Sequence, residues 1–188
     1  MALLVTGLLV FFAPHFLPMA RGRRASLLAQ WGEGRYKGVF SAVSGVGLLL
    51  IIAGYAYAER GAQWFAPSPL ARSIAPEAMT LVFILLASSH GTSHIRAWIK
   101  HPMLVAVLIW SVLHLLANGD ARGTILFGSF AAYALIDLVS AVSRGAFVAF
   151  APRWKSDAIA VVAGAVVALL VMLLHRILFG VGVVSFGV

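Results

Sequence analysis

The stretch PMLVAVLIWSVLHLLA, residues Pro102–Ala117, decides the fold class because it contains no Lys, Arg, Asp or Glu. Helical blocks of about 16–21 apolar residues can cross the hydrocarbon layer of a bilayer, which is ~30 Å thick. Five further blocks of this kind lie at Ala2–Met19, Gly38–Ala58, Pro76–Ile95, Thr124–Ser143 and Ala158–His175. The sequence therefore predicts an all-α, polytopic helical membrane protein with about six transmembrane helices.

The overall composition supports a membrane protein and excludes other classes. Of 188 residues, 62% are hydrophobic and only 11% are charged, whereas a soluble domain has about 25% charged residues. This excess of apolar residues excludes a disordered chain. The absence of Cys excludes a disulfide scaffold, a thiolate haem ligand and a cysteine-bound iron–sulfur cluster. No internal repeat is visible, so the sequence gives no support to an inverted-repeat transporter. We expect residues 1–188 to form a single transmembrane domain.

The net charge of +8 is an orientation signal rather than a sign of nucleic-acid binding. Only Arg60, Arg72 and Arg122 lie in the second and fourth loops, and Arg176 lies at the end of the last block. The first, third and fifth loops hold the other ten: Arg21, Arg23, Arg24, Arg35, Lys37, Arg96, Lys100, Arg144, Arg153 and Lys155. By the positive-inside rule these three loops are cytoplasmic, so both termini are predicted to be periplasmic. We therefore expect a multi-pass protein of the bacterial inner membrane, with the lipid bilayer as a partner and no nucleic acid.

Small residues repeat at helical spacing in two of the blocks. Ala160, Gly164 and Ala168 follow each other every four residues, and Ser41 and Gly45 have the same spacing. Such faces let helix backbones approach closely. We predict that both faces pack against neighbouring helices.

Titratable residues inside a bilayer are costly, and they usually face a bundle interior or a cavity. The candidates are His15, His90, His94, His114, Asp137 and His175. His15 lies between Pro14 and Pro18, each of which removes a helical hydrogen bond. Irregular backbone is tolerated in lipid only where protein or a cavity covers it. His15 is therefore a stronger candidate than a His in a regular helix.

His114 is the best single candidate for a site residue. Its helical neighbours at positions −3, −4 and +4 are Ser111, Trp110 and Asn118, which form a polar and aromatic stripe. We expect this stripe to face a cofactor or protein rather than lipid. Measured along the helices, His15 and His114 differ in depth by about 10 Å, which is large for two ligands of one metal ion. Helix tilt and the broken first helix can reduce this difference.

Two interpretations of Asp137 remain open. Its carboxylate can accept the second N–H of a metal-ligating His and so fix the orientation of that ring. Alternatively, Asp137 pairs with an Arg such as Arg96 or Arg144. His90 and His94 have the four-residue spacing of shared metal ligands, but a membrane di-iron site needs more His residues than the six in this chain. His175 is interpreted as an interfacial residue.

Several segments together resemble the NnrU family of bacterial inner-membrane proteins. They are Lys100–Leu104 (KHPML), Trp110–Asp120 (ending in HLLANGD), Ile125–Phe130 (ILFGSF), Asp137, His15 and His175–Val181 (HRILFGV). The resemblance covers essentially the whole chain. It implies an association with denitrification and nitric oxide metabolism.

The same domain occurs in plant 15-cis-ζ-carotene isomerase, a membrane haem b enzyme with two axial ligands. The resemblance implies that His15 and His114 ligate haem b here and that Asp137, Asn118 and Ser111 contribute to cofactor binding. It also implies an isoprenoid or nitric oxide ligand. The plant enzyme carries a Cys where this chain has Ser111, so an exchange of ligand to a thiolate does not carry over. Because Pro residues flank His15, we expect it to be the ligand that leaves the iron.

Two alternatives to a haem enzyme with isomerase-like or redox activity remain open. One is a non-enzymatic sensor of nitric oxide, or an assembly factor that works with a respiratory partner in the membrane. The other is an S-adenosylmethionine-dependent membrane methyltransferase, because Lys100-His101-Pro102 is similar to part of the motif of those enzymes. Leu104 and Ala106 replace the Tyr and Gly of that motif, so this alternative is the weaker one.

Overall fold

Seven helices build the part of the chain that the computed structural model describes, residues 1–183. They are α1 (Ala2–His15), α2 (Arg21–Tyr57), α3 (Pro69–Ser88), α4 (His94–Ile99), α5 (Pro102–Asn118), α6 (Ala121–Ser143) and α7 (Trp154–Phe179). Within residues 1–183 there is no strand, only an isolated bridge between Gln63 and Asp120. The prediction of an all-α protein is confirmed.

Four of these helices are long and apolar enough to cross a membrane: α2, α3, α6 and α7. The apolar helices α1 and α5 have 14 and 17 residues. At 1.5 Å per residue they are about 21 and 26 Å long, which is less than the ~30 Å of a hydrocarbon layer. The chain is therefore a helical membrane protein with four helices of spanning length and two shorter apolar ones.

The third predicted block is displaced relative to the helix that forms there. The helix α3 begins at Pro69 rather than Pro76, because Ser68 caps it by accepting a hydrogen bond from the Ala71 N–H (3.2 Å) and Pro69 fits its first turn. It ends at Ser88 rather than at residue 95. His90 and His94 consequently lie outside α3.

The first predicted loop is also helical. The helix α2 already begins at Arg21, and only Gly32, with a φ of 73°, interrupts it. Good helix formers such as Ala25, Leu27 and Leu28 explain why this basic segment is helical.

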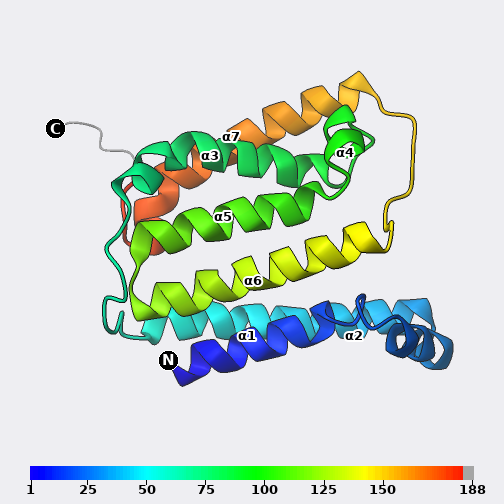
Figure 1. Ribbon diagram of the computed structural model, residues 1–188, viewed down its shortest axis with the longest axis horizontal. Helices are drawn as coiled ribbons and strands as arrows, with labels where there is room; N and C mark the ends of the chain where they lie inside the picture. Colours follow the sequence, from blue (N-terminus) through cyan, green and yellow to red (C-terminus); the bar gives the residue numbers. More distant parts are fainter. Residues whose placement is uncertain (184–188) are drawn as a thin grey trace.

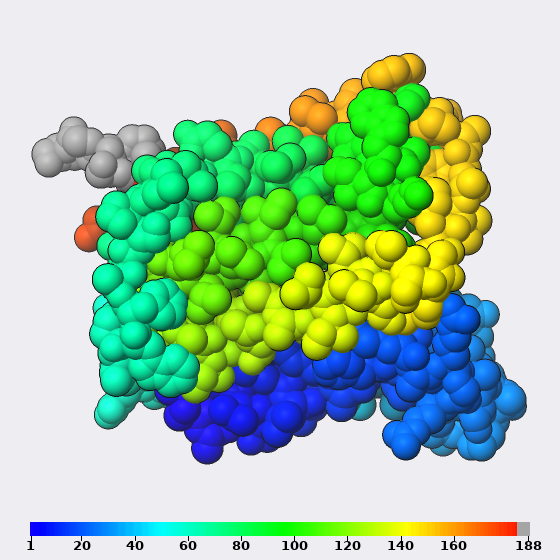
Figure 2. All heavy atoms as spheres, viewed as in Figure 1, coloured from blue at the N-terminus to red at the C-terminus, as the bar shows by residue number. Residues whose placement is uncertain are grey.

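Six helices lie side by side with their axes roughly parallel, and the short α4 lies at one end (Figure 1). The hairpin of α1 and α2 lies on one side of α6, and α5 lies on the other side, followed by α3 and α7. In the same view, the spheres of Figure 2 show α6 between these two groups. The pairs α1–α2, α3–α7, α5–α6 and α3–α5 are closely packed, whereas α1 and α6 meet more sparsely. We call this sparsely packed contact between α1 and α6 the seam of the bundle, because it joins the α1–α2 hairpin to the other helices.

Small residues allow the helices of two pairs, α3–α7 and α1–α2, to pack with their backbones close together. Ala160, Gly164 and Ala168 of α7 are buried, and a Cβ on Gly164 would lie 2.5 Å from the Cα of Ile84 in α3. This confirms the packing predicted for α7. The prediction for Ser41 and Gly45 is wrong, because both are exposed.

In α2 the close contacts with α1 are made instead by Gly47 and Gly54, which lie seven residues apart. A Cβ on Gly47 would lie 2.5 Å from the backbone nitrogen of Phe11, and one on Gly54 would collide with the backbone of Leu4. The spacing of seven residues places both glycines on one face of α2, two turns apart. The face that packs on α1 is therefore not the one marked by Ser41 and Gly45.

We predict that Gly54→Leu lowers the free energy of unfolding by about 1–3 kcal/mol, because the new side chain forces α1 and α2 apart. Gly45→Leu is the matched control, since no atom lies within 4 Å of a Cβ at that position. Unfolding of detergent-purified protein, followed by circular dichroism, measures both variants. An equal loss in the two variants would contradict the close approach at Gly54.

Candidate functional site

His15 lies at the point where proline ends α1. In a continuing helix its carbonyl would accept the N–H of Met19, but that group donates to Phe16 instead, and Pro18 has no N–H to offer. The His15 imidazole donates from Nδ1 to the carbonyl of Phe11 at 2.6 Å and stacks on the Phe11 ring, with centroids 4.3 Å apart. Its Nε2 therefore carries the free lone pair.

His114 has the same arrangement in α5. Its Nδ1 donates to the carbonyl of Trp110 at 2.8 Å, so Nε2 again carries the lone pair. The ring packs against Trp110 of the same helix and against Phe127 of α6, at centroid distances of 5.4 and 5.0 Å. The stripe predicted from the sequence thus does face protein, namely the aromatic surface of α6.

The two polar neighbours of His114 are occupied by hydrogen bonds within α5. Ser111 is 0% exposed, and its hydroxyl donates to the carbonyl of Val107 at 2.7 Å. The Asn118 amide donates to the carbonyl of His114 at 2.6 Å. Asn118 therefore supports the turn that carries His114, and the hydroxyl hydrogen of Ser111 is used within α5.

Aromatic rings fill the space between the two histidines. The central ring is Phe130 of α6, which lies 5.6 Å from Phe11 and 5.4 Å from Trp110. His15 contacts α6 at Tyr133, with ring centroids 5.9 Å apart, and His114 contacts α6 at Phe127. Six residues along α6 separate these contacts, which corresponds to about 9 Å. The structure thus places the imidazoles at different depths, and Phe130 lies between them.

Asp137 lies one helical turn beyond Tyr133 on α6. The Tyr133 hydroxyl donates to an Asp137 carboxylate oxygen at 3.1 Å and lies 3.4 Å from the carbonyl oxygen of His15, so its single hydrogen is shared between them. The other Asp137 oxygen lies 3.6 Å from the guanidinium of Arg144. Of the two interpretations of Asp137, the structure places it as the partner of Arg144. It reaches His15 only through Tyr133, at the backbone rather than the ring.

Tyr133 is the site residue that sequence reasoning missed. Its spacing of four from Asp137 puts both side chains on one face of a helix, and this is the signal that was available. Its contact with the carbonyl of His15 was not predictable, because that contact depends on how α1 packs against α6.

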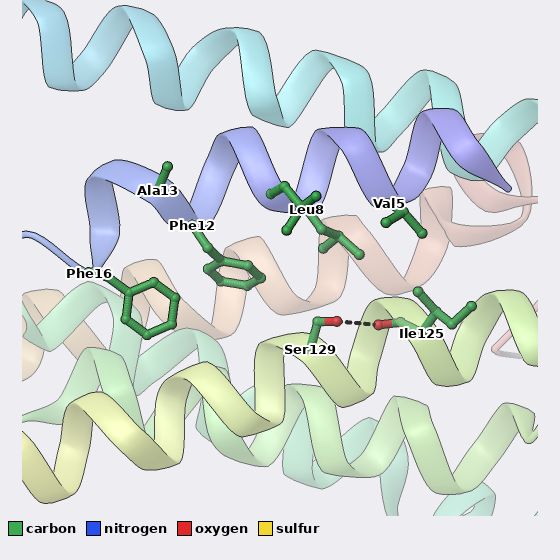
Figure 3. A pocket seen from close by; sticks show the side chains of 8 residues that line it. Val5, Leu8, Phe12, Ala13, Phe16, Ile125 and Ser129 are labelled. Carbon is green, nitrogen blue, oxygen red and sulfur yellow. Dashed lines mark hydrogen bonds between the residues drawn. The ribbon is translucent and has the colours of Figure 1, made fainter.

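An apolar groove of about 420 Å³ opens between α1 and α6 beside this cluster. Figure 3 shows Leu8 and Phe12 of α1, and Phe16 directly after α1, on one side and Ile125 and Ser129 of α6 on the other. The only hydroxyl lining the groove, that of Ser129, donates to the carbonyl of Ile125 at 2.7 Å. The groove therefore offers an apolar surface next to Phe12, which packs against Phe130.

His90 and His94 do not form a pair on one helical face, which corrects their predicted placement inside a span. His90 is exposed in the turn after α3, and His94 opens α4 and bonds through Nδ1 to Asp157 at 2.6 Å. His175 lies in the last turns of α7, where Nδ1 donates to the carbonyl of Val181 at 2.7 Å. None of these three residues joins His15 and His114.

Within residues 1–183 no group of three or more His, Asp or Glu side chains could hold a metal ion. A haem site is of another kind, because the porphyrin supplies four nitrogens and the protein only the axial ligands. The residues that bear on haem binding are thus the two separate imidazoles.

Comparison with known proteins gives one result. The family model described as NnrU protein matches residues 3–183, nearly the whole chain. No curated protein and no solved structure matches this chain. The matched range includes His15, His114 and Asp137.

We predict that Tyr133→Phe lowers the free energy of unfolding by about 1–2 kcal/mol, because it removes the donor to Asp137 and to the carbonyl of His15 while keeping the ring. Tyr57→Phe is the matched control, since Tyr57 is 86% exposed. Thermal unfolding in one detergent compares the two variants with the parent. If Tyr133→Phe is as stable as Tyr57→Phe, the hydroxyl does not hold α1 to α6.

Proposed function

Because the chain belongs to the NnrU family, we propose that it is a bacterial inner-membrane protein that binds haem b through His15 and His114. The observation that carries the proposal is the matching state of the two imidazoles. Each donates its Nδ1–H to the carbonyl four residues earlier and keeps Nε2 free. A metal-ligating His typically has this arrangement, in which one ring nitrogen is fixed by a hydrogen bond and the other binds the metal.

The Nε2 atoms of His15 and His114 are suitable ligands for a haem iron. The two rings lie at different depths in the bundle, however, and this limits how both could bind one iron. Metal–imidazole bonds are about 2 Å long, so two imidazole nitrogens that held the same iron would lie within about 4 Å of each other. The α6 residues that the two rings contact, Tyr133 and Phe127, lie about 9 Å apart along the helix. Ligation by both rings at once therefore requires α1 to shift along α6. His114 belongs to the closely packed α5–α6 pair, so we assign it as the permanent ligand and His15 as the one that joins or leaves.

The bound haem would supply a redox-active iron that can bind nitric oxide when one axial position is open. The chain's own residues orient the two imidazoles and exclude water by means of Phe127, Phe130 and Trp110. Asp137 and Tyr133 contribute by holding the end of α1, and Ser111 and Asn118 by supporting the helix that carries His114.

Two ligand classes follow from this proposal. Nitric oxide, as in denitrification, needs only the open position on the iron. An isoprenoid polyene, as in a haem-dependent isomerase-like reaction, also needs an apolar surface, and the groove between α1 and α6 offers one. The groove therefore favours the polyene. We propose this reaction class for the single domain of residues 1–188.

We also propose that six helices cross the membrane, with both termini on the periplasmic side. Support comes from the arrangement of the loops. The turn after α1, the segment around α4 and the loop between α6 and α7 lie at the same end of the bundle, and the N-terminus lies at the other (Figure 1). The basic residues gather at the first of these ends. Although α1 and α5 are short, they lie alongside the four helices of spanning length.

We predict that purified, haem-loaded protein shows a Soret band and that His114→Ala lowers haem occupancy by more than about tenfold, because the permanent ligand is lost. His15→Ala is expected to retain the band but to change from a low-spin to a high-spin spectrum. His175→Ala is the control and should match the parent. The absence of a Soret band after expression with added haem would refute the proposal.

We predict opposite labelling for cysteines placed in two exposed loops of this Cys-free chain. Ala66→Cys, in the loop before α3, should react with a membrane-impermeable maleimide added to spheroplasts. Ala151→Cys, in the loop before α7, should react only after the membrane is broken. Labelling of both cysteines from the same side would contradict the proposed topology.

A further inference from the structure

Asp157 fixes the short helix α4 to the first turn of α7. Its carboxylate accepts hydrogen bonds from Nδ1 of His94 at 2.6 Å and from the backbone N–H of Ile95 at 3.2 Å. The His94 ring also stacks on Trp154, with centroids 4.0 Å apart and an interplanar angle of 26°. In addition, the Arg153 N–H donates to the carbonyl of Thr92 at 2.7 Å. α4 and the start of α7 therefore present one continuous surface.

This surface is positively charged, because its only acidic residue is turned inward. Residues 89–101 and 144–157 contain five Lys or Arg residues and one acidic residue, Asp157. The Asp157 side chain is 13% exposed and is bonded to α4. Lys100, Arg153 and Lys155 are exposed. No carboxylate in these two segments therefore offsets their charge at the surface.

Two tryptophans accompany these cations. Trp98 of α4 is 73% exposed and Trp154 of α7 is 72% exposed. Tryptophan prefers the level of the lipid headgroups, where the ring contacts apolar chains and the N–H reaches water. Figure 2 shows α4 beside the start of α7 at one end of the molecule. Cations and tryptophans thus occur together on this surface, the combination that is typical of the headgroup level of membrane proteins.

Lys100 occupies an unusual backbone position. It ends α4 with a φ of 64°, the only positive φ among the non-glycine residues 1–183. Glycine is the residue that adopts such a conformation at the lowest cost. A Lys is held there instead, at the edge of the charged surface.

We propose that the surface formed by Trp98, Lys100, Arg153, Trp154 and Lys155 binds the phosphate headgroup of an anionic membrane lipid. Charge complementarity selects an anionic over a zwitterionic headgroup. The exposed rings of Trp98 and Trp154 select a lipid over a free phosphate, because they need apolar chains beside the headgroup.

The test compares the full chain in nanodiscs of phosphatidylcholine with nanodiscs of an equimolar mixture of phosphatidylcholine and phosphatidylglycerol. We expect a higher thermal midpoint in the mixture, and the difference should shrink at high salt. The variant with Lys100→Gln, Arg153→Gln and Lys155→Gln should lose this difference. All three side chains are exposed, so circular dichroism should show an unchanged helical content.

A second variant with equal loss of charge provides the control. Arg21→Gln, Arg23→Gln and Arg24→Gln remove three exposed cations from the start of α2 and should keep the stabilisation by phosphatidylglycerol. Equal loss in both variants would show a general charge effect and overturn the proposal. Stabilisation of the detergent-solubilised protein by inorganic phosphate alone would overturn the assignment to a lipid.

Discussion

Inside a bilayer every backbone carbonyl must find a donor within the protein, and the end of α1 is where this chain meets that requirement in an unusual way. Pro18 offers no N–H, and that of Met19 is directed to Phe16. The hydroxyl of Tyr133 lies beside the carbonyl of His15 that is left over. The proline that makes His15 conspicuous in the sequence therefore also creates the polar contact between α1 and α6. The position of His15 therefore rests on this polar contact together with the ring contacts of Phe12 and His15 with Tyr133.

The same requirement explains much of the pattern HLLANGD, residues 114–120, at the opposite end of the bundle. The last carbonyls of α5 accept hydrogen bonds from the preceding loop: Trp64 N–H donates to Gly119 at 2.8 Å and Ser68 N–H to Leu116 at 2.8 Å. Gly119, with a φ of 73°, ends α5, and a side chain there would collide with the carbonyl of Phe65. Asp120 then caps α6. The motif thus consists of the last helical residues of α5 and the Gly119–Asp120 turn into α6, and within it the His114 ring keeps its Nε2 free for a ligand.

The sequence predicts elements whose limits are set locally and misplaces those set by tertiary contacts. The bounds of α5 follow from an apolar run between Pro102 and a Gly–Asp turn, so they are predicted to within one residue, and the end of α6 is predicted at Ser143 although its start is predicted three residues late. The predicted start of α3 is seven residues too late, because a hydropathy pattern does not register the capping hydrogen bond of Ser68. In the site, His15, His114 and Asp137 are predictable from the sequence, because a titratable side chain inside an apolar block is energetically unfavourable and therefore stands out. The pairing of Asp137 with Arg144 was one of the two interpretations of that residue. The role of Tyr133 was not predictable, because a Tyr in a membrane helix is unremarkable until the helix opposite it is known.

Packing also limits how His15 can approach His114. At Gly7, Gly47 and Gly54 the backbones of α1 and α2 are in contact with no side chain between them. Sliding α1 along α2 would drive those backbones into neighbouring side chains, so the two helices move as one body. The seam with α6, by contrast, consists of separate aromatic contacts and an open groove. A change in the depth of His15 therefore carries the whole hairpin and must first break the hydrogen bond from Tyr133. Through that bond the position of His15, and with it the ligation proposed for this residue, is coupled to the charge pair of Asp137 with Arg144.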